Sequence, residues 1–207
     1  GRQAISDAEA AALKVAKGYH KDVSDAVFMS TRGGSVYERT FLSSFIRPGI
    51  GARNWVSRNN YPALGIIQTG ATELSLYVNQ DYAQPTAHLR RYSLRLDGFA
   101  SLFAPYEGGE LLTKFFKFRG DRLELNFSTS AIGGIRVEIQ DEAGQVIPGF
   151  AAADCTEIIG NEIARVVRWK NNADVSKLAS QPVRLRFVLK DCDLYSLRFA
   201  AVTGNGD

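Results

Sequence analysis

Short runs of alternating apolar and charged residues fill the second half of the chain, and turns rich in Gly, Asp or Pro separate them. The clearest runs are residues 122–127, 135–139 and 183–189. A period of two places every second side chain on one face of a strand, so each run predicts a half-buried strand with one dry face and one charged, wet face. We therefore expect residues 98–207 to form an antiparallel β-sandwich of the jelly-roll type.

The first residues follow a different pattern, which is typical of a helix. Ser6 and Glu9 have the spacing of a capping box, and an Ala-rich stretch, residues 10–17, comes directly after them. Gly18 is a natural helix stop. The pattern predicts one short helix within an N-terminal segment, residues 1–22.

Residues 23–97 are predicted to form a second all-β region. Gly33 and Gly34 can adopt the positive φ angles of a tight hairpin between strands at 25–30 and 35–41, and further strands follow between residues 63 and 96. Up-and-down connections predict a four-stranded antiparallel meander, the arrangement of a single β-propeller blade. Apart from the N-terminal helix, the whole chain is therefore expected to be all-β.

A long irregular loop, residues 47–62, interrupts this meander. It contains three arginines, three asparagines, a tryptophan and a tyrosine, with glycines and prolines that restrict its path. Loops longer than about 12 residues in compact domains tend to be functional or disordered, and this loop is too aromatic for disorder. We therefore expect it to form a surface that faces a ligand.

Composition and charge narrow the classes of partner. Of the 207 residues, 45% are hydrophobic and 23% charged, which is ordinary for a globular protein. The basic residues are scattered opposite acidic ones along the predicted strands, so the net charge of +3 gives no stripe that a phosphate backbone would select. We expect no nucleic-acid partner.

Membrane and targeting signals are missing from the sequence. No apolar run approaches the roughly 20 residues of a membrane helix, and the start lacks a basic region followed by an apolar core. We expect no membrane partner. Either the chain is cytosolic or its targeting segment has been removed, and of the two we favour a secreted or periplasmic location.

The residues that most often bind metals or form cross-links are few. Cys155 and Cys192 are able to form one disulfide or to remain separate buried thiols, and we favour thiols because a sandwich of this size needs no cross-link. The two cysteines have no metal spacing, and His20 and His88 lie far apart without a ligand motif. We expect neither a metal site nor a cofactor.

Glycine pairs give no sign of a phosphate loop. They occur at residues 33–34, 108–109 and 133–134, in each case between predicted strands. Phosphate cradles instead need a turn from a strand into a helix, with backbone amides aimed at the anion. We predict that all three pairs are hairpin turns.

Several motifs resemble the last blade of five-bladed β-propeller glycoside hydrolases, the invertase-like and arabinanase-like group, and its bacterial relatives. These motifs are residues 25–37, 45–49, 53–55, 58–62 and 73–78. Residues 96–102 resemble the crossover from that propeller into a C-terminal sandwich. The module that follows the propeller in those relatives is similar to the segments 168–170, 174–178, 182–187 and 194–199.

The resemblance implies a non-catalytic C-terminal portion of a glycoside-hydrolase-like protein, which braces the propeller, binds carbohydrate, or does both. Enzymes of that group take their catalytic acids from earlier blades, and this chain has room for one blade only. Glycoside hydrolysis needs two carboxylates roughly 5 to 9.5 Å apart across the sugar. We cannot place such a pair, so we assign no catalytic residues and expect the isolated chain to be inactive.

An isolated blade exposes strand edges and an apolar face that neighbouring blades would otherwise cover. The N-terminal helix, the sandwich, upstream propeller blades or a second copy of the chain are the candidates to cover them. The expected partners are therefore an oligosaccharide or polysaccharide, together with upstream blades or a homo-oligomer.

The candidate carbohydrate-binding residues all lie in the long loop. Planar donors and aromatic faces suit the hydroxyls and rings of sugars. The candidates are Arg53, Trp55, Arg58, Asn59, Asn60 and Tyr61. In the alternative interpretation, the asparagines shape the loop through bonds to the backbone, Arg58 caps a carbonyl, and Trp55 anchors the loop as a buried side chain.

Two other functions stay open. In the first, the chain is a self-contained glycan hydrolase with its site at the junction of blade and sandwich, around Arg58, Asn59 and His88. In the second, it is a structural or oligomerisation module that binds no ligand.

Overall fold

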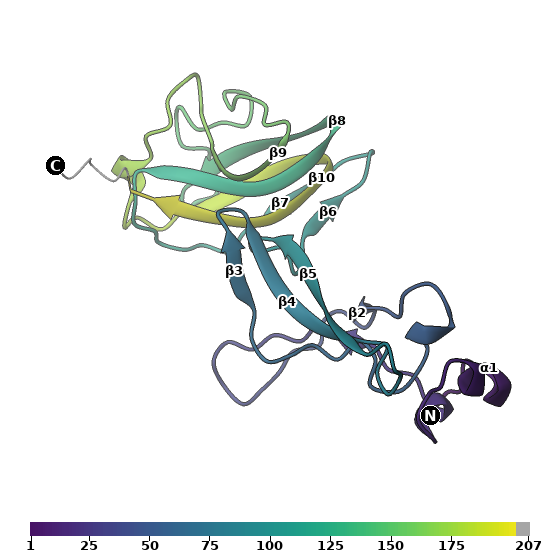
Figure 1. Cartoon of the computed structure of the whole chain (residues 1–207). Helices are drawn as coiled ribbons and strands as arrows, with labels where there is room; N and C mark the ends of the chain where they lie inside the picture. The colour runs from purple at the N-terminus through teal and green to yellow at the C-terminus, as the bar shows by residue number, and fades with distance from the viewer. Residues whose placement is uncertain (202–207) are drawn as a thin grey trace. The chain divides into compact units, whose positions relative to one another are not determined.

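The computed structural model describes residues 1–201, which fall into two compact units (Figure 1). Unit 1 is Gly1–Leu96 and unit 2 begins at Asp97. The regular structure of both units is almost entirely antiparallel strand, and α1 is the one α-helix among the described residues. The prediction of an all-β chain with one short N-terminal helix is confirmed. None of the helices in the described part is long and apolar enough to cross a membrane.

Helix α1, Asp7–Ala12, begins with the predicted capping box. The Ser6 side chain accepts from the Glu9 amide, and the Glu9 carboxylate accepts from the Ser6 amide. The expectation that the helix continues to residue 17 is wrong. Lys14 adopts a φ of 56°, and the Val15 amide donates back to the Ala10 carbonyl, which closes a Schellman motif two residues after the helix.

The strands of unit 1 divide between two sheets, rather than forming the single four-stranded meander that we expected. Strands β1 (Ala26–Val27) and β2 (Ser44–Ile46) form a two-stranded antiparallel sheet. Strands β3 (Ile67–Gly70), β4 (Glu73–Gln80) and β5 (His88–Arg95) form a three-stranded sheet in sequence order.

The strand expected at 35–41 does not form. Only a bridge between Ser30 and Glu38 remains of the predicted hairpin, and β1 pairs with β2 instead. Every residue from 29 to 43 is exposed. An alternating pattern stabilises a strand when one face is buried, and here neither face finds a core.

Unit 1 has two small apolar clusters. One contains Ile46, Leu76 and Val78, and lies on one face of the β3–β5 sheet. The other contains Ile5, Ala10 and Val56, so the N-terminal helix packs against the long loop at residues 47–62.

Unit 2 is one five-stranded antiparallel sheet that curls into half a barrel (Figure 1). Its strands are β6 (Leu102–Ala104), β7 (Gly109–Leu112), β8 (Arg122–Gln140), β9 (Asn161–Val166) and β10 (Arg184–Ala200). Strand β10 pairs with β8 along almost its whole length, and with β6 and β7 on its other edge. The structure therefore places the strands of unit 2 in one curled sheet, where we expected the two sheets of a jelly-roll sandwich.

The bend in these long strands depends on Gly133, which we predicted to lie in a hairpin turn. Gly133 lies inside β8, and a Cβ atom there would overlap the Asp191 carbonyl oxygen of β10. Opposite it, β10 has a register shift between Lys190 and Cys192, and Asp191 has a φ of 41°. The close approach of the two backbones requires glycine and marks the turn of the sheet around its core.

The dry face of the sheet surrounds a single core. Phe127, Val137 and Phe187 are fully buried there, and the indole nitrogen of the buried Trp169 donates to the Val137 carbonyl at 2.8 Å. Cys155 and Cys192 are free buried thiols, as predicted, and burial raises the pKa of both.

The predicted charged face carries ion pairs between strands. Glu124 lies between Arg122 and Arg198 at 2.8 and 2.7 Å. Burial alone would raise the pKa of this carboxyl, but the hydrogen bonds from Arg198 and Arg122 outweigh burial and hold the pKa below its usual range.

Candidate functional site

The long loop at 47–62 is fixed to the rest of unit 1 at several points. Its only regular element is the 3-10 turn η2, Ala52–Asn54. Val56 is fully buried against α1, and the Ser57 amide donates to the Tyr19 carbonyl at 2.8 Å. The Asn60 amide donates to the Asn79 carbonyl of β4 at 2.9 Å. The loop is therefore an ordered surface.

Asn59 and Asn60 are fully buried. Asn59 donates to the Asn54 carbonyl at 3.0 Å and accepts from the Tyr82 amide at 3.3 Å. The side chain of Asn60 donates to the Ser24 carbonyl at 3.2 Å. These bonds make the two asparagines the supports of the loop, as the alternative interpretation supposed, and no polar atom of Asn59 faces solvent.

Arg58 is exposed and lies close to two tyrosine rings. Its guanidinium carbon is 5.6 Å from the centroid of Tyr19 and 6.0 Å from that of Tyr82. A hydrogen bond with the Tyr82 hydroxyl, at 3.4 Å, is the main cause that raises the pKa of Arg58. Arg58 thus stacks on tyrosine, and it caps no carbonyl in the part of the chain that the structure describes. Tyr61 is also exposed, and its carbonyl accepts from the Asn79 amide.

Trp55 and Arg53 line two different hollows. The Trp55 hollow has a volume of about 1140 Å³, and the Arg53 hollow has about 440 Å³. Gly51 and Ala52 border both. The Trp55 side chain is 39% exposed, and its indole nitrogen donates to the Gly49 carbonyl at 3.1 Å, which fixes the ring in place.

Polar side chains from three segments line the Trp55 hollow. They come from the N-terminal residues, from the approach to β1, and from β2 with the start of the loop. They are Arg2, Gln3, Glu9, Asp25, Ser44 and Arg47. The hollow therefore combines an aromatic side chain with donors and acceptors of both charges.

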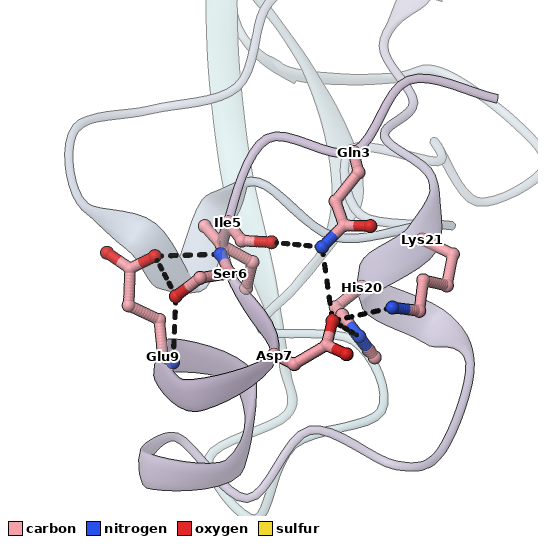
Figure 2. Close-up of polar contacts among 7 residues, drawn as sticks. All are labelled: Gln3, Ile5, Ser6, Asp7, Glu9, His20 and Lys21. Carbon is pink, nitrogen blue, oxygen red and sulfur yellow. Dashed lines mark hydrogen bonds and ion pairs between the residues drawn. The ribbon is translucent and has the colours of Figure 1, made fainter.

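The N-terminal wall of the Trp55 hollow is held by a polar cluster around Asp7 (Figure 2). One oxygen of Asp7 accepts from Lys21 at 2.5 Å, from His20 at 2.9 Å and from Gln3 at 3.2 Å. These bonds, that of Lys21 first, lower the pKa of Asp7 to about 2. The second ring nitrogen of His20 is buried without a hydrogen-bond partner among residues 1–201.

Glu9 is the carboxylate of this wall. Figure 2 shows its bonds to the backbone nitrogen and the hydroxyl of Ser6, both at 2.8 Å. The bond from the backbone nitrogen is the larger cause that lowers the pKa of Glu9. Glu9 is therefore held as an anion at neutral pH.

The Arg53 hollow is lined by residues that our sequence analysis did not group. They include Leu13, Asn54, Gln80, Asp81, His88 and Arg90. Of these, Arg90 follows His88 by two residues in a predicted strand, and that spacing places both on one face. The period of the strand could thus have placed Arg90 beside His88 from the sequence. The nearness of Arg90 to Arg53 depends on the path of the loop and could not have been predicted.

The remaining tests of the site concern metals and known proteins. Among residues 1–201, no group of three or more His, Cys, Asp or Glu side chains is placed to hold a metal ion. No family model matches the chain, and no curated protein or solved structure matches it.

Proposed function

We propose that this chain is the non-catalytic C-terminal portion of a glycoside-hydrolase-like protein, and that unit 1 binds carbohydrate in the Trp55 hollow. The observation that carries the proposal is the placement of Trp55, half-exposed and tethered, in a large open hollow with a polar rim. Aromatic side chains of this kind offer an apolar face to a ring while polar neighbours bond its hydroxyls.

The size of the hollow favours an oligosaccharide over a single sugar. Its volume of about 1140 Å³ lies above the range of roughly 300–1,000 Å³ that is typical of sites for drug-sized ligands. Because the indole N–H already bonds to Gly49, Trp55 contributes its ring face, and the hydrogen bonds to a sugar fall to Arg47, Asp25 and Ser44.

The electrostatics of Glu9 do not fit the general acid of a glycosidase. A glycosidase general acid has a raised pKa, so that it holds a proton at neutral pH. The bonds from Ser6 shift the pKa of Glu9 in the opposite direction.

Exposed apolar side chains support the role in bracing a larger protein. Between residues 29 and 42, large hydrophobic side chains face solvent, up to an exposed fraction of 77% at Leu42. They are Met29, Val36, Tyr37, Phe41 and Leu42. Apolar surface of this kind is typical of a contact with a neighbour, and we propose that upstream propeller blades are that neighbour.

The Trp55→Ala variant tests the carbohydrate site. We expect it to weaken binding of a responsive oligosaccharide at least about tenfold, because a central tryptophan commonly supplies much of the binding energy of a site. Titration calorimetry against a panel of neutral and acidic oligosaccharides measures the affinity. Tyr37→Ala is the matched control, since Tyr37 is an exposed aromatic outside the hollow. Unchanged affinity in Trp55→Ala would move the site elsewhere.

A further inference from the structure

Strand β5 places His88 and Arg90 side by side on one face of its sheet. In the register with β4, His88 pairs with Gln80 and Arg90 pairs with Val78. Val78 is fully buried in the cluster on this face, and residues two apart share a face. Both His88 and Arg90 line the Arg53 hollow.

The long loop and the β4–β5 connection bring a second guanidinium to the same hollow. Arg53 donates to the Thr86 hydroxyl at 3.0 Å, and that hydroxyl donates to Asp81 at 2.7 Å. The carboxylate of Asp81 is thus bonded by a neutral hydroxyl. Within the part of the chain that the structure describes, the Arg53 guanidinium forms no ion pair.

Arg90 has still fewer partners. Its guanidinium has no hydrogen-bond or ion-pair partner among residues 1–201. The next residue behaves differently, because Arg91 forms an ion pair with Glu73 at 2.8 Å. Two arginines and one aspartate therefore give the Arg53 hollow a surplus of positive charge.

His88 adds a directed polar group to this surplus. Its Nδ1 lies 2.8 Å from the Thr86 carbonyl oxygen, which only accepts, so Nδ1 carries the hydrogen. The Nε2 edge of the ring has no partner among the described residues. When the ring is protonated, Nε2 becomes a third donor toward an anion.

We infer that the Arg53 hollow binds an anionic group, and that the carbohydrate held by unit 1 is therefore an acidic glycan. Guanidinium groups match carboxylate, sulfate and phosphate groups in charge and in geometry. Because Gly51 and Ala52 border both hollows, one acidic oligosaccharide is able to contact Trp55 and place a charged substituent near Arg53 and Arg90. This inference rests on the proposed function for its sugar part. Its charge rests on two guanidinium groups that form no ion pair among residues 1–201.

The charge of unit 1 agrees with this assignment. Unit 1 contains 12 Lys and Arg against 7 Asp and Glu, a formal charge of +5. Unit 2 contains 13 against 15, a formal charge of −2. The small net charge of the whole chain thus conceals a basic unit, which attracts acidic ligands over distances of about a Debye length.

The test compares an oligogalacturonate with its methyl-ester form, which has the same rings without the charges. We expect the wild-type protein to bind the acid at least about tenfold more tightly than the ester, since hydrogen bonds from a guanidinium group to a charged acceptor are stronger than those to a neutral one. Arg90→Gln and Arg53→Gln should each remove most of that preference. Arg91→Gln is the matched control, with the same change one residue along on the opposite face, and should keep the preference.

A second measurement separates the two proposals. Inorganic sulfate is titrated into the protein while amide NMR signals of residues 50–54 and 80–90 are followed, with wild type and Arg90→Gln compared. Sulfate shifts lost in Arg90→Gln, without binding of any oligosaccharide, would uphold the anion site and contradict the carbohydrate function. Equal affinity of the wild-type protein for acid and ester, or a preference for the acid that is unchanged in Arg90→Gln, would overturn the anion site even if Trp55→Ala abolishes binding.

Binding of other anionic polymers tests whether the ligand is a glycan. A single-stranded oligonucleotide that binds as tightly as the oligogalacturonate would overturn the assignment to a glycan. Binding of a sulfated oligosaccharide but not of the uronate would keep the acidic glycan and identify sulfate as its charged group.

Discussion

Unit 2 packs twenty buried side chains into one core around two long strands, whereas unit 1 divides its central buried apolar residues between two clusters of three. Unit 1 compensates with buried polar groups. Asn59, Asn60, Gln80 and Gln84 are all buried there, and each bonds to backbone or to another amide. Hydrophobic burial is therefore the main force in unit 2, and directional bonds set the shape of unit 1.

The two units also differ in how their charged side chains are paired. Buried carboxylates of unit 2, such as Glu124, are matched by arginines of the neighbouring strands. In unit 1, Arg53 and Arg90 line a hollow, and neither forms an ion pair with a carboxylate of the described residues. A sheet that satisfies its own charges is suited to a structural role, while unmatched charges at an ordered loop are suited to binding.

The largest expected effect comes from the core of unit 2. We predict that Phe127→Ala lowers the free energy of unfolding by about 3–5 kcal/mol, because Phe127 is fully buried in the continuous core. Val78→Ala, in a three-residue cluster of unit 1, should cost about 1–2 kcal/mol. Denaturant titrations measure both. Trp55 belongs to unit 1 and Trp169 to unit 2, so fluorescence of single-tryptophan variants follows each unit separately. Equal losses would contradict the contrast in packing.

Removing one buried amide should have an intermediate effect on unit 1 alone. Asn60→Ala removes the side-chain donor of the Ser24 carbonyl and one of the two acceptors of the Gln80 side-chain nitrogen, which keeps its bond to the Asn79 carbonyl. The expected cost is about 1–3 kcal/mol for the buried carbonyl left unpaired. The Trp55 signal should report the loss. Asn171→Ala is the control, since Asn171 also has a positive φ but is exposed. Similar losses in both variants would assign the effect to the backbone.

The smallest expected effect is the loss of stability in acid that comes from the Asp7 cluster of Figure 2. The folded-state pKa of Asp7 is about 2, below the ordinary 3.8, so the ionised carboxylate favours the folded state. Its contribution should be complete above about pH 4 and should be lost as the pH falls toward 2. The carboxyl carbon signal of Asp7 in an NMR titration reads this directly. Lys21→Ala should raise the pKa of Asp7, and titration of wild-type Asp7 near 3.8 would refute the cluster's effect.

The strands of unit 2 could be predicted because period-two patterns there follow a real buried face. Residues 122–127 and 135–139 were recognised as strands, but their union in β8 was missed. A Gly pair is compatible with a hairpin turn and also with a bend inside a strand. Only the approach of Asp191, more than 50 residues later, decides between the two.

The site could be predicted only as a loop and a set of residue types. Trp55 is exposed because the bond to Gly49 holds its ring at the surface, while Asn60 is buried by partners at Ser24 and Gln80. Those partners are distant in sequence, so composition alone cannot separate a ligand contact from a structural amide. Arg90 was missed because its lack of a partner depends on neighbours in space.

Strand β10 is the last strand of unit 2 to leave the ribosome. Strands β6, β7 and β8 all pair with β10, yet β10 is synthesised after them, and its partners begin as far back as Leu102. A nascent chain that stops before Arg184 therefore holds most of the core residues of unit 2 but not the strand that joins them. Unit 1 is complete long before that point, so the loop at residues 47–62 is synthesised with all of its unit 1 contacts before the half-barrel of unit 2 is assembled.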